Sequence, residues 1–99
     1  MIKLEIVSVR QLNKSTIDRF FTSDFGIAEY IQKHFTDTGK LVNVSIKISE
    51  DYSTQTKTLF FKDIEAYMDF VNNDVLQYQE LLQNRYNSWH NITVDKSVT

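Results

Sequence analysis

The stretch from Lys62 to His90 constrains the fold of this chain more than any other feature. Apolar side chains recur through it at alternating spacings of three and four residues, which is the repeat of one face of an α-helix. Because such a stripe needs a surface to bury it, we expect it to form the helical side of the core. The stripe consists of Ile64, Met68, Val71, Val75, Tyr78, Leu82 and Trp89, with Arg85 or Tyr86 filling the remaining gap.

Three poor helix formers, Asn72, Asn73 and Asp74, interrupt this stretch. Asp74 followed by Gln77 is a candidate start for a new helix. The stretch is therefore either one bent helix or two helices in series. Because the apolar stripe keeps its phase across the interruption, we predict one long, near-continuous helix with a kink at Asn72–Asp74.

Residues 41–49 give the clearest strand signal in the chain, because apolar and polar residues alternate through them. We predict that one face of this strand is buried and the other is wet, which is typical of an antiparallel sheet. A turn at residues 50–53 and a returning strand at residues 55–61 complete a hairpin. The side chains assigned to the buried face are Val42, Val44, Ile46 and Ile48.

Residues 2–9 and 91–95 predict two further strands. Apolar and polar residues alternate over the first half of residues 2–9, but the apolar parity flips at Val7 and Val9. This flip indicates either a strand buried on both faces, as in the centre of a sheet, or a β-bulge. The last strand is short, and we expect residues 96–99 to form a frayed tail.

Residues 25–35 predict a helix of about three turns. Ser23 or Asp24 is the candidate N-cap, and Gly39 is the candidate terminator. A short helical turn around Ile17 is expected before this helix. The first helix therefore lies between the strand at the N-terminus and the hairpin.

The expected order is strand, helix, strand, strand, helix, strand, and it resembles that of ferredoxin-like domains. We therefore predict one α+β domain over residues 1–99, a ferredoxin-like βαββαβ sandwich. Its sheet would be antiparallel, with the helices on one face and the first and third strands in the centre. This fold hosts many unrelated functions, so the resemblance predicts none of them.

The composition limits the kinds of chemistry that the chain can perform. It has no cysteine, which excludes disulfides, thiolate metal sites and a cysteine nucleophile. No apolar run approaches the ~18 residues of a membrane span, and the N-terminus lacks the apolar region of a signal peptide. We therefore expect a cytoplasmic protein. The richness in Asn, Tyr, Phe, Ile and Lys is typical of an AT-rich genome, such as that of a bacteriophage or a Firmicute.

We expect no catalytic, metal-binding or cofactor-binding residue in this chain. The two histidines, His34 and His90, are far apart in sequence, whereas a metal pair on a helix needs a spacing of three or four. The acidic pairs Glu50–Asp51 and Asp63–Glu65 stand in a predicted turn and at a predicted helix start. Each pair thus has a sufficient structural role there.

Several large side chains are candidates for binding a partner protein. Phe60 lies between Leu59 and Phe61, and because neighbouring strand residues face opposite sides, one side of this run points away from the core. Others fall off the main stripe of the long helix. These either pack against the first helix or form a contact surface with aromatic anchors, and the sequence leaves both readings open. The candidates are Phe60, Tyr67, Phe70, Leu81, Tyr86 and Trp89.

Nucleic-acid binding is the least favoured class of function. The net charge is −2, and the stretch 62–90 carries five acidic against two basic side chains. No general attraction to phosphates is expected from such a balance. The basic residues that would have to act in this role are Arg10, Lys14, Lys47 and Lys57.

These observations together predict a small, non-catalytic protein-interaction or regulatory module that forms a homodimer. A phage-type accessory protein that binds and modulates a host protein fits this description. The alternative is a small-ligand-binding or enzymatic dimeric α+β domain with an aromatic pocket, in which His34 or His90 is the acid–base group. The candidate pocket residues are Phe21, Tyr30, Tyr67, Tyr78 and Trp89.

Overall fold

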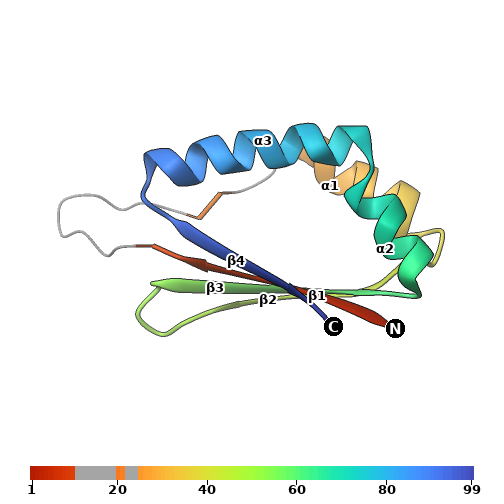
Figure 1. The fold of residues 1–99 in the computed structure, drawn as a ribbon, viewed down its shortest axis with the longest axis horizontal. Helices are drawn as coiled ribbons and strands as arrows, with labels where there is room; N and C mark the ends of the chain where they lie inside the picture. The colour runs from red at the N-terminus through yellow and green to blue at the C-terminus, as the bar shows by residue number, and fades with distance from the viewer. Residues whose placement is uncertain (11–19, 22–24) are drawn as a thin grey trace.

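A four-stranded antiparallel sheet carries the described helices on one side (Figure 1). The computed structural model describes residues 1–10, 20–21 and 25–99. The expected turn around Ile17 and the candidate caps Ser23 and Asp24 lie outside these residues. The strands are β1 (Ile2–Val9), β2 (Leu41–Ile48), β3 (Thr54–Phe61) and β4 (Thr93–Val98); the helices are α1 (Phe25–Ile31), α2 (Ile64–Val71) and α3 (Asp74–Trp89), and a π-helical turn, η1 (Gln32–Thr36), follows α1.

The strand order is β2-β3-β1-β4, so β1 and β3 occupy the centre of the sheet, as predicted. Leu4 of β1 lies opposite Leu59 of β3 and Val98 of β4. The pairing of β1 with both neighbours runs without a shift, so the parity flip at Val7 and Val9 is not a bulge. These two valines alternate along β1 with Leu4 and Ile6, which face the helices, so they lie on the opposite face of the sheet.

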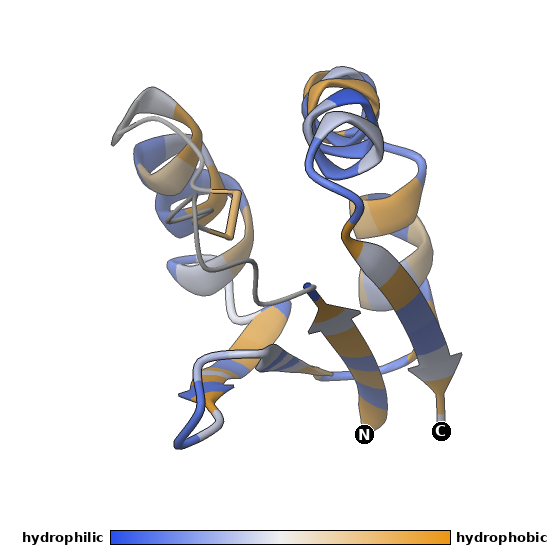
Figure 2. Ribbon diagram, turned by 90° about the vertical axis from the view of Figure 1, so that its left-hand side faces the viewer, coloured by the Kyte–Doolittle hydropathy of each residue, from blue (hydrophilic) through white to orange (hydrophobic). Residues whose placement is uncertain are grey.

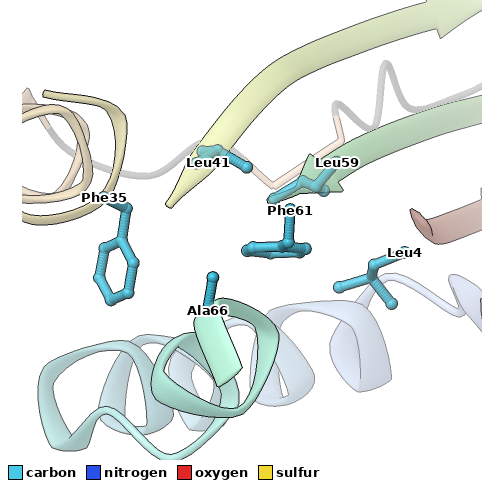
Figure 3. Close-up of a cluster of buried hydrophobic side chains, with 6 residues drawn as sticks. All are labelled: Leu4, Phe35, Leu41, Leu59, Phe61 and Ala66. Atoms are coloured by element: carbon cyan, nitrogen blue, oxygen red, sulfur yellow. The ribbon is translucent and has the colours of Figure 1, made fainter. Parts of the chain in front are cut away.

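The core lies between the sheet and the first turns of α2, where β3 ends (Figure 3). Phe61 is fully buried, and its ring packs against Tyr67 and Phe70 with centroid distances of 5.6 and 5.1 Å. Phe35 of η1 meets Phe70 from the other side at 5.1 Å. The buried cluster consists of Leu4, Phe35, Leu41, Leu59, Phe61 and Ala66.

The face of β2 that carries its apolar side chains is not buried, which corrects the prediction for this strand. Leu41 is buried, but a register shift against β3 follows it, and Val42, Val44, Ile46 and Ile48 are all exposed by about half. β2 is an edge strand, and beyond Leu41 its apolar side chains stay about half exposed. Alternation thus identified a common face for Val44, Ile46 and Ile48, but it could not tell whether a helix covers that face.

The expected frayed tail belongs to the sheet instead. β4 continues to Val98, and the backbone N–H of Thr99 donates to the carbonyl oxygen of Lys3 at 2.9 Å. Lys96 lies opposite Ile6 in the regular pairing with β1. Pairing with a central strand holds these residues, although their composition is typical of a terminus.

The predicted long helix is two separate helices, which corrects the preference for one kinked helix. α2 ends at Val71 and α3 begins at Asp74. Asn73 is extended and caps α3, because its side-chain oxygen accepts a hydrogen bond from the N–H of Leu76 at 3.1 Å. The cap is thus Asn73 and not Asp74.

Replacing Phe61 tests how far the fold depends on this cluster. We expect Phe61→Ala to lower the free energy of unfolding by about 3–5 kcal/mol, because it leaves a cavity beneath α2. Chemical denaturation measures this loss. Phe60→Ala is the matched control, since Phe60 is only half-buried on the opposite face, and its cost should be clearly smaller. Equal losses for the two variants would contradict this placement of the core.

Candidate functional site

The apolar stripe of α2 and α3 faces solvent and not the sheet. Leu81 and Trp89 are 64% and 77% exposed, and the other members of the exposed set are at least 40% exposed. Most of the predicted stripe is thus exposed, so the prediction that it forms the core is wrong. Val71 and Leu82 of that stripe are half-buried, whereas Leu81, which was predicted to lie off the stripe, is exposed. We call this surface the solvent-facing stripe; it consists of Ile64, Met68, Val75, Tyr78, Leu81 and Trp89.

The inward side of α3 is largely polar. After Leu76, the residues that α3 turns toward the sheet include Gln79 and Gln83, which are half-buried, and Asn87, which is buried. Burying amide side chains is costly unless polar partners lie opposite them. An inward polar side and an outward apolar side invert the usual arrangement of a surface helix. Core packing alone therefore explains neither the exposed apolar side of α3 nor its inward polar side.

The structure separates the predicted partner-binding residues into four groups. Tyr67 and Phe70 pack against the core cluster, which agrees with the reading that they serve internal packing. Tyr86 is half-buried and meets the ring of Phe21 at 5.5 Å. Leu81 and Trp89 are exposed on the solvent-facing stripe. Phe60 is half-buried on the uncovered face of the sheet, opposite Lys3 and Asn43, and is therefore remote from the others.

The acidic turn and the histidines have local structural surroundings. Hydrogen bonds from the side chains of Ser49 and Ser53, and from the backbone N–H of Ser53, lower the pKa of Asp51 to about 2. Asp51 thus organises the β2–β3 turn. His34 stacks on Tyr30, and His90 stacks on Tyr86, each as its near neighbour in sequence.

A cavity of about 380 Å³ lies between the sheet and the helices. Figure 2 shows α1 and α3 standing apart on the helical side of the sheet, with α3 on the side of β4. The cavity is lined by both helices, by α2 and by strands β1, β3 and β4. Its volume falls within the ~300–1,000 Å³ that ligand pockets usually occupy. Of the aromatic residues proposed for a pocket, only Tyr67 lines it, and neither histidine does.

Two lysines enter this cavity from the sheet. Lys57 of β3 and Lys96 of β4 lie on either side of Ile6 in the pairing, so all three share the face beneath the helices. Lys96 forms an ion pair with Glu80 of α3. Within the described residues, Lys57 makes no ion pair or hydrogen bond, and burial lowers the pKa of its ammonium group.

Sequence reasoning missed these lysines, although a signal was present. Lys57 has the same strand parity as Leu59 and Phe61, and Lys96 has the same parity as Val98. Because residues two apart in a strand face the same side of the sheet, both lysines lie on the face that the helices cover. This placement also separates Lys57 from Lys47, which lies on the uncovered face, so these two of the basic residues considered for nucleic acid do not share a surface. Lys14 lies outside the described residues.

Comparison with known proteins adds no family assignment: no family model, no curated protein and no solved structure matches this chain. Across the described ranges, three or more His, Asp or Glu side chains nowhere gather in a way that would hold a metal ion. No helix in the same ranges is both long and apolar enough to cross a bilayer. The candidate sites are therefore argued from geometry alone.

The environment of Lys57 predicts a pH dependence of stability. The folded state holds the Lys57 proton less tightly than the unfolded chain, whose lysines have a pKa near 10.5. The unfolded state thus binds more protons in the window between the lowered pKa and 10.5, and stability should gain a contribution as the pH rises through this window. Lys57→Met lacks this contribution. The variant should therefore be more stable than wild type at pH 7, and the difference in unfolding free energy between the two should shrink toward pH 10.

Chemical denaturation at a series of pH values measures this difference. Lys47→Met is the matched control, because Lys47 is exposed on the other face of the sheet. A pH profile of Lys57→Met that runs parallel to wild type would show that Lys57 is not desolvated.

Proposed function

We propose that this chain is a non-catalytic protein-interaction module whose first partner is a second copy of itself. The observation that carries the proposal is the exposure of the solvent-facing stripe, above all of Leu81 and Trp89. Tyr and Trp side chains are typical anchors of protein interfaces. A helix that turns its apolar side to water gains most by covering that side with another apolar surface.

The spacing of the stripe on α3 favours another helix as the covering element. Val75, Tyr78, Leu81, Arg85 and Trp89 are all exposed and follow one another at distances of three or four, the spacings by which residues of one helix face meet a second helix. α3 has 16 residues and is thus about 24 Å long. Two α3 helices packed side by side would cover each other's stripe along this length.

The charges on α3 favour an antiparallel pair. Asp74 stands in its first turn and Arg85 near its other end; both are exposed, and neither makes an ion pair within the described part of the chain. A two-fold axis would place Asp74 of one protomer beside Arg85 of its partner, at both ends of the contact. Antiparallel helices also oppose their dipoles favourably. The surface is therefore complementary to itself, as a two-fold contact requires.

The size of this contact predicts a weak association. One helix from each protomer provides most of it, which places it below the ~1,200 Å² of a standard interface. We expect a monomer–dimer equilibrium in about the micromolar range. Such an equilibrium suits a regulatory module, since the copy on the stripe can be exchanged for another partner.

We also propose that the domain is ferredoxin-like. The strand order β2-β3-β1-β4 and the helices on one side of the sheet support this assignment. The division of the last helix into α2 and α3 is a departure from the simple βαββαβ order. The assignment itself carries no functional argument.

Removing the anchors of the stripe tests the proposal. The double variant Leu81→Gln/Trp89→Gln should weaken dimerisation roughly thirtyfold or more, because both anchors are lost from both protomers. Sedimentation velocity over a range of concentrations measures the equilibrium. Tyr52→Asn is the matched control, since Tyr52 is equally exposed but lies in the β2–β3 turn. A wild-type protein that stays monomeric at high concentration would contradict self-association.

A charge exchange tests the antiparallel arrangement. Asp74→Arg or Arg85→Glu alone should weaken the dimer about two- to tenfold, because each places like charges together at both ends. The combined Asp74→Arg/Arg85→Glu variant should recover most of the wild-type affinity at low salt. Circular dichroism controls for helix loss, since Asp74 also favours the start of α3. Losses that simply add in the double variant would exclude this pairing.

A further inference from the structure

We propose that the cavity beneath α3 binds an aliphatic monocarboxylate, with the carboxylate at Lys57 and the chain directed toward the core. This site is separate from the solvent-facing stripe, because Leu81 and Trp89 do not line the cavity. It thus goes beyond the proposed self-association. It also replaces the histidine-containing aromatic pocket that the sequence suggested.

The lining of the cavity changes from polar to apolar along the strands. One row across the sheet consists of Lys57, Ile6 and Lys96, and the next row toward the core contains Leu59, Leu4 and Val98. Two residues along a strand span about 6.6 Å, so the polar and apolar ends lie a few bond lengths apart. From the helices, apolar side chains complete the second region: Ile27, Ile31, Phe70 and Leu76.

The charge at the polar end is what selects an anion. Glu80 neutralises Lys96, whereas Lys57 has no counter-charge among the described residues. An ammonium group held in partly apolar surroundings favours a ligand that brings a negative charge to it. One uncompensated cation accommodates one anionic group, and a second negative charge would itself be unpaired. A monocarboxylate therefore fits better than a dianion.

The roof of the cavity provides further polar partners. Gln79 and Gln83 stand one turn apart on α3 and line the cavity above the lysine row. Their amide N–H groups can donate hydrogen bonds to a carboxylate. This accounts for the polar inward side of α3, which core packing does not explain.

Titration with decanoate, followed by ¹⁵N–¹H NMR on the full chain, tests the proposal. We expect saturable shifts at the amides of Leu4, Lys57 and Leu59, and binding at least about tenfold tighter than that of decanol, which lacks the charge. Acetate, which lacks the chain, should also bind at least about tenfold more weakly. Absence of saturable shifts at these amides, or equal affinities for decanoate and decanol, would overturn the proposal.

Two pairs of variants separate the head group from the cavity. Lys57→Met should weaken decanoate at least about tenfold and leave decanol unchanged, whereas Lys47→Met, on the uncovered face, should change neither. Gln83→Phe places a ring in the cavity and should block both ligands, whereas Asn84→Phe, on the exposed side of α3, should block neither. A Lys57→Met variant that binds decanoate like wild type would exclude Lys57 as the anion partner. Decanoate binding that survives Gln83→Phe unchanged would exclude the cavity.

Discussion

Hydrogen bonds of Asn73 connect the three α-helices that the structure describes. Its side-chain oxygen caps α3 through the N–H of Leu76, and its amide nitrogen donates to the hydroxyl of Tyr30 at 2.9 Å. The first bond caps the start of α3, the backbone N–H of Asn73 donates to the carbonyl oxygen of Phe70 in α2 at 3.3 Å, and the bond to Tyr30 joins this corner to α1. Because α2 is thereby a helix of its own, it can pack on Phe61 while α3 runs above the sheet (Figure 1).

The position of α3 over the cavity gives it two different surfaces. On the inside, Gln79 and Gln83 stand above a row of the sheet that contains two lysines, so polar groups face polar groups. On the outside, the apolar stripe has no described part of the chain to cover it. The same helix thus separates an apolar surface suited to a second copy from a cavity suited to an anion. Substitutions on one side need not disturb the other.

The hydrophobic pattern located most elements of the fold but not their surroundings. β1, the β2–β3 hairpin and α1 lie close to where the spacing of apolar residues placed them, and β1 and β3 are central as the connections require. The pattern failed where it had to say which surface is covered. Ile46 of β2 and Tyr78 of α3 have the spacing of core residues, but both are exposed. β2 is an edge strand, and Tyr78 lies on the side of α3 that faces away from the sheet. Lys57 shows the opposite case, a charged residue beneath the helices.

The sequence by itself determined the α+β class, the hairpin and an interruption of the helical stretch near Asn73, because these depend on local spacing and local backbone preference; that the interruption separates two helices was decided by the structure. Only the tertiary structure decided that the stripe faces water, that Tyr67 and Phe70 belong to the core and that Lys57 enters a cavity. Periodicity fixes which residues share a face. It does not fix the direction of that face, which depends on where the other layers of the domain lie.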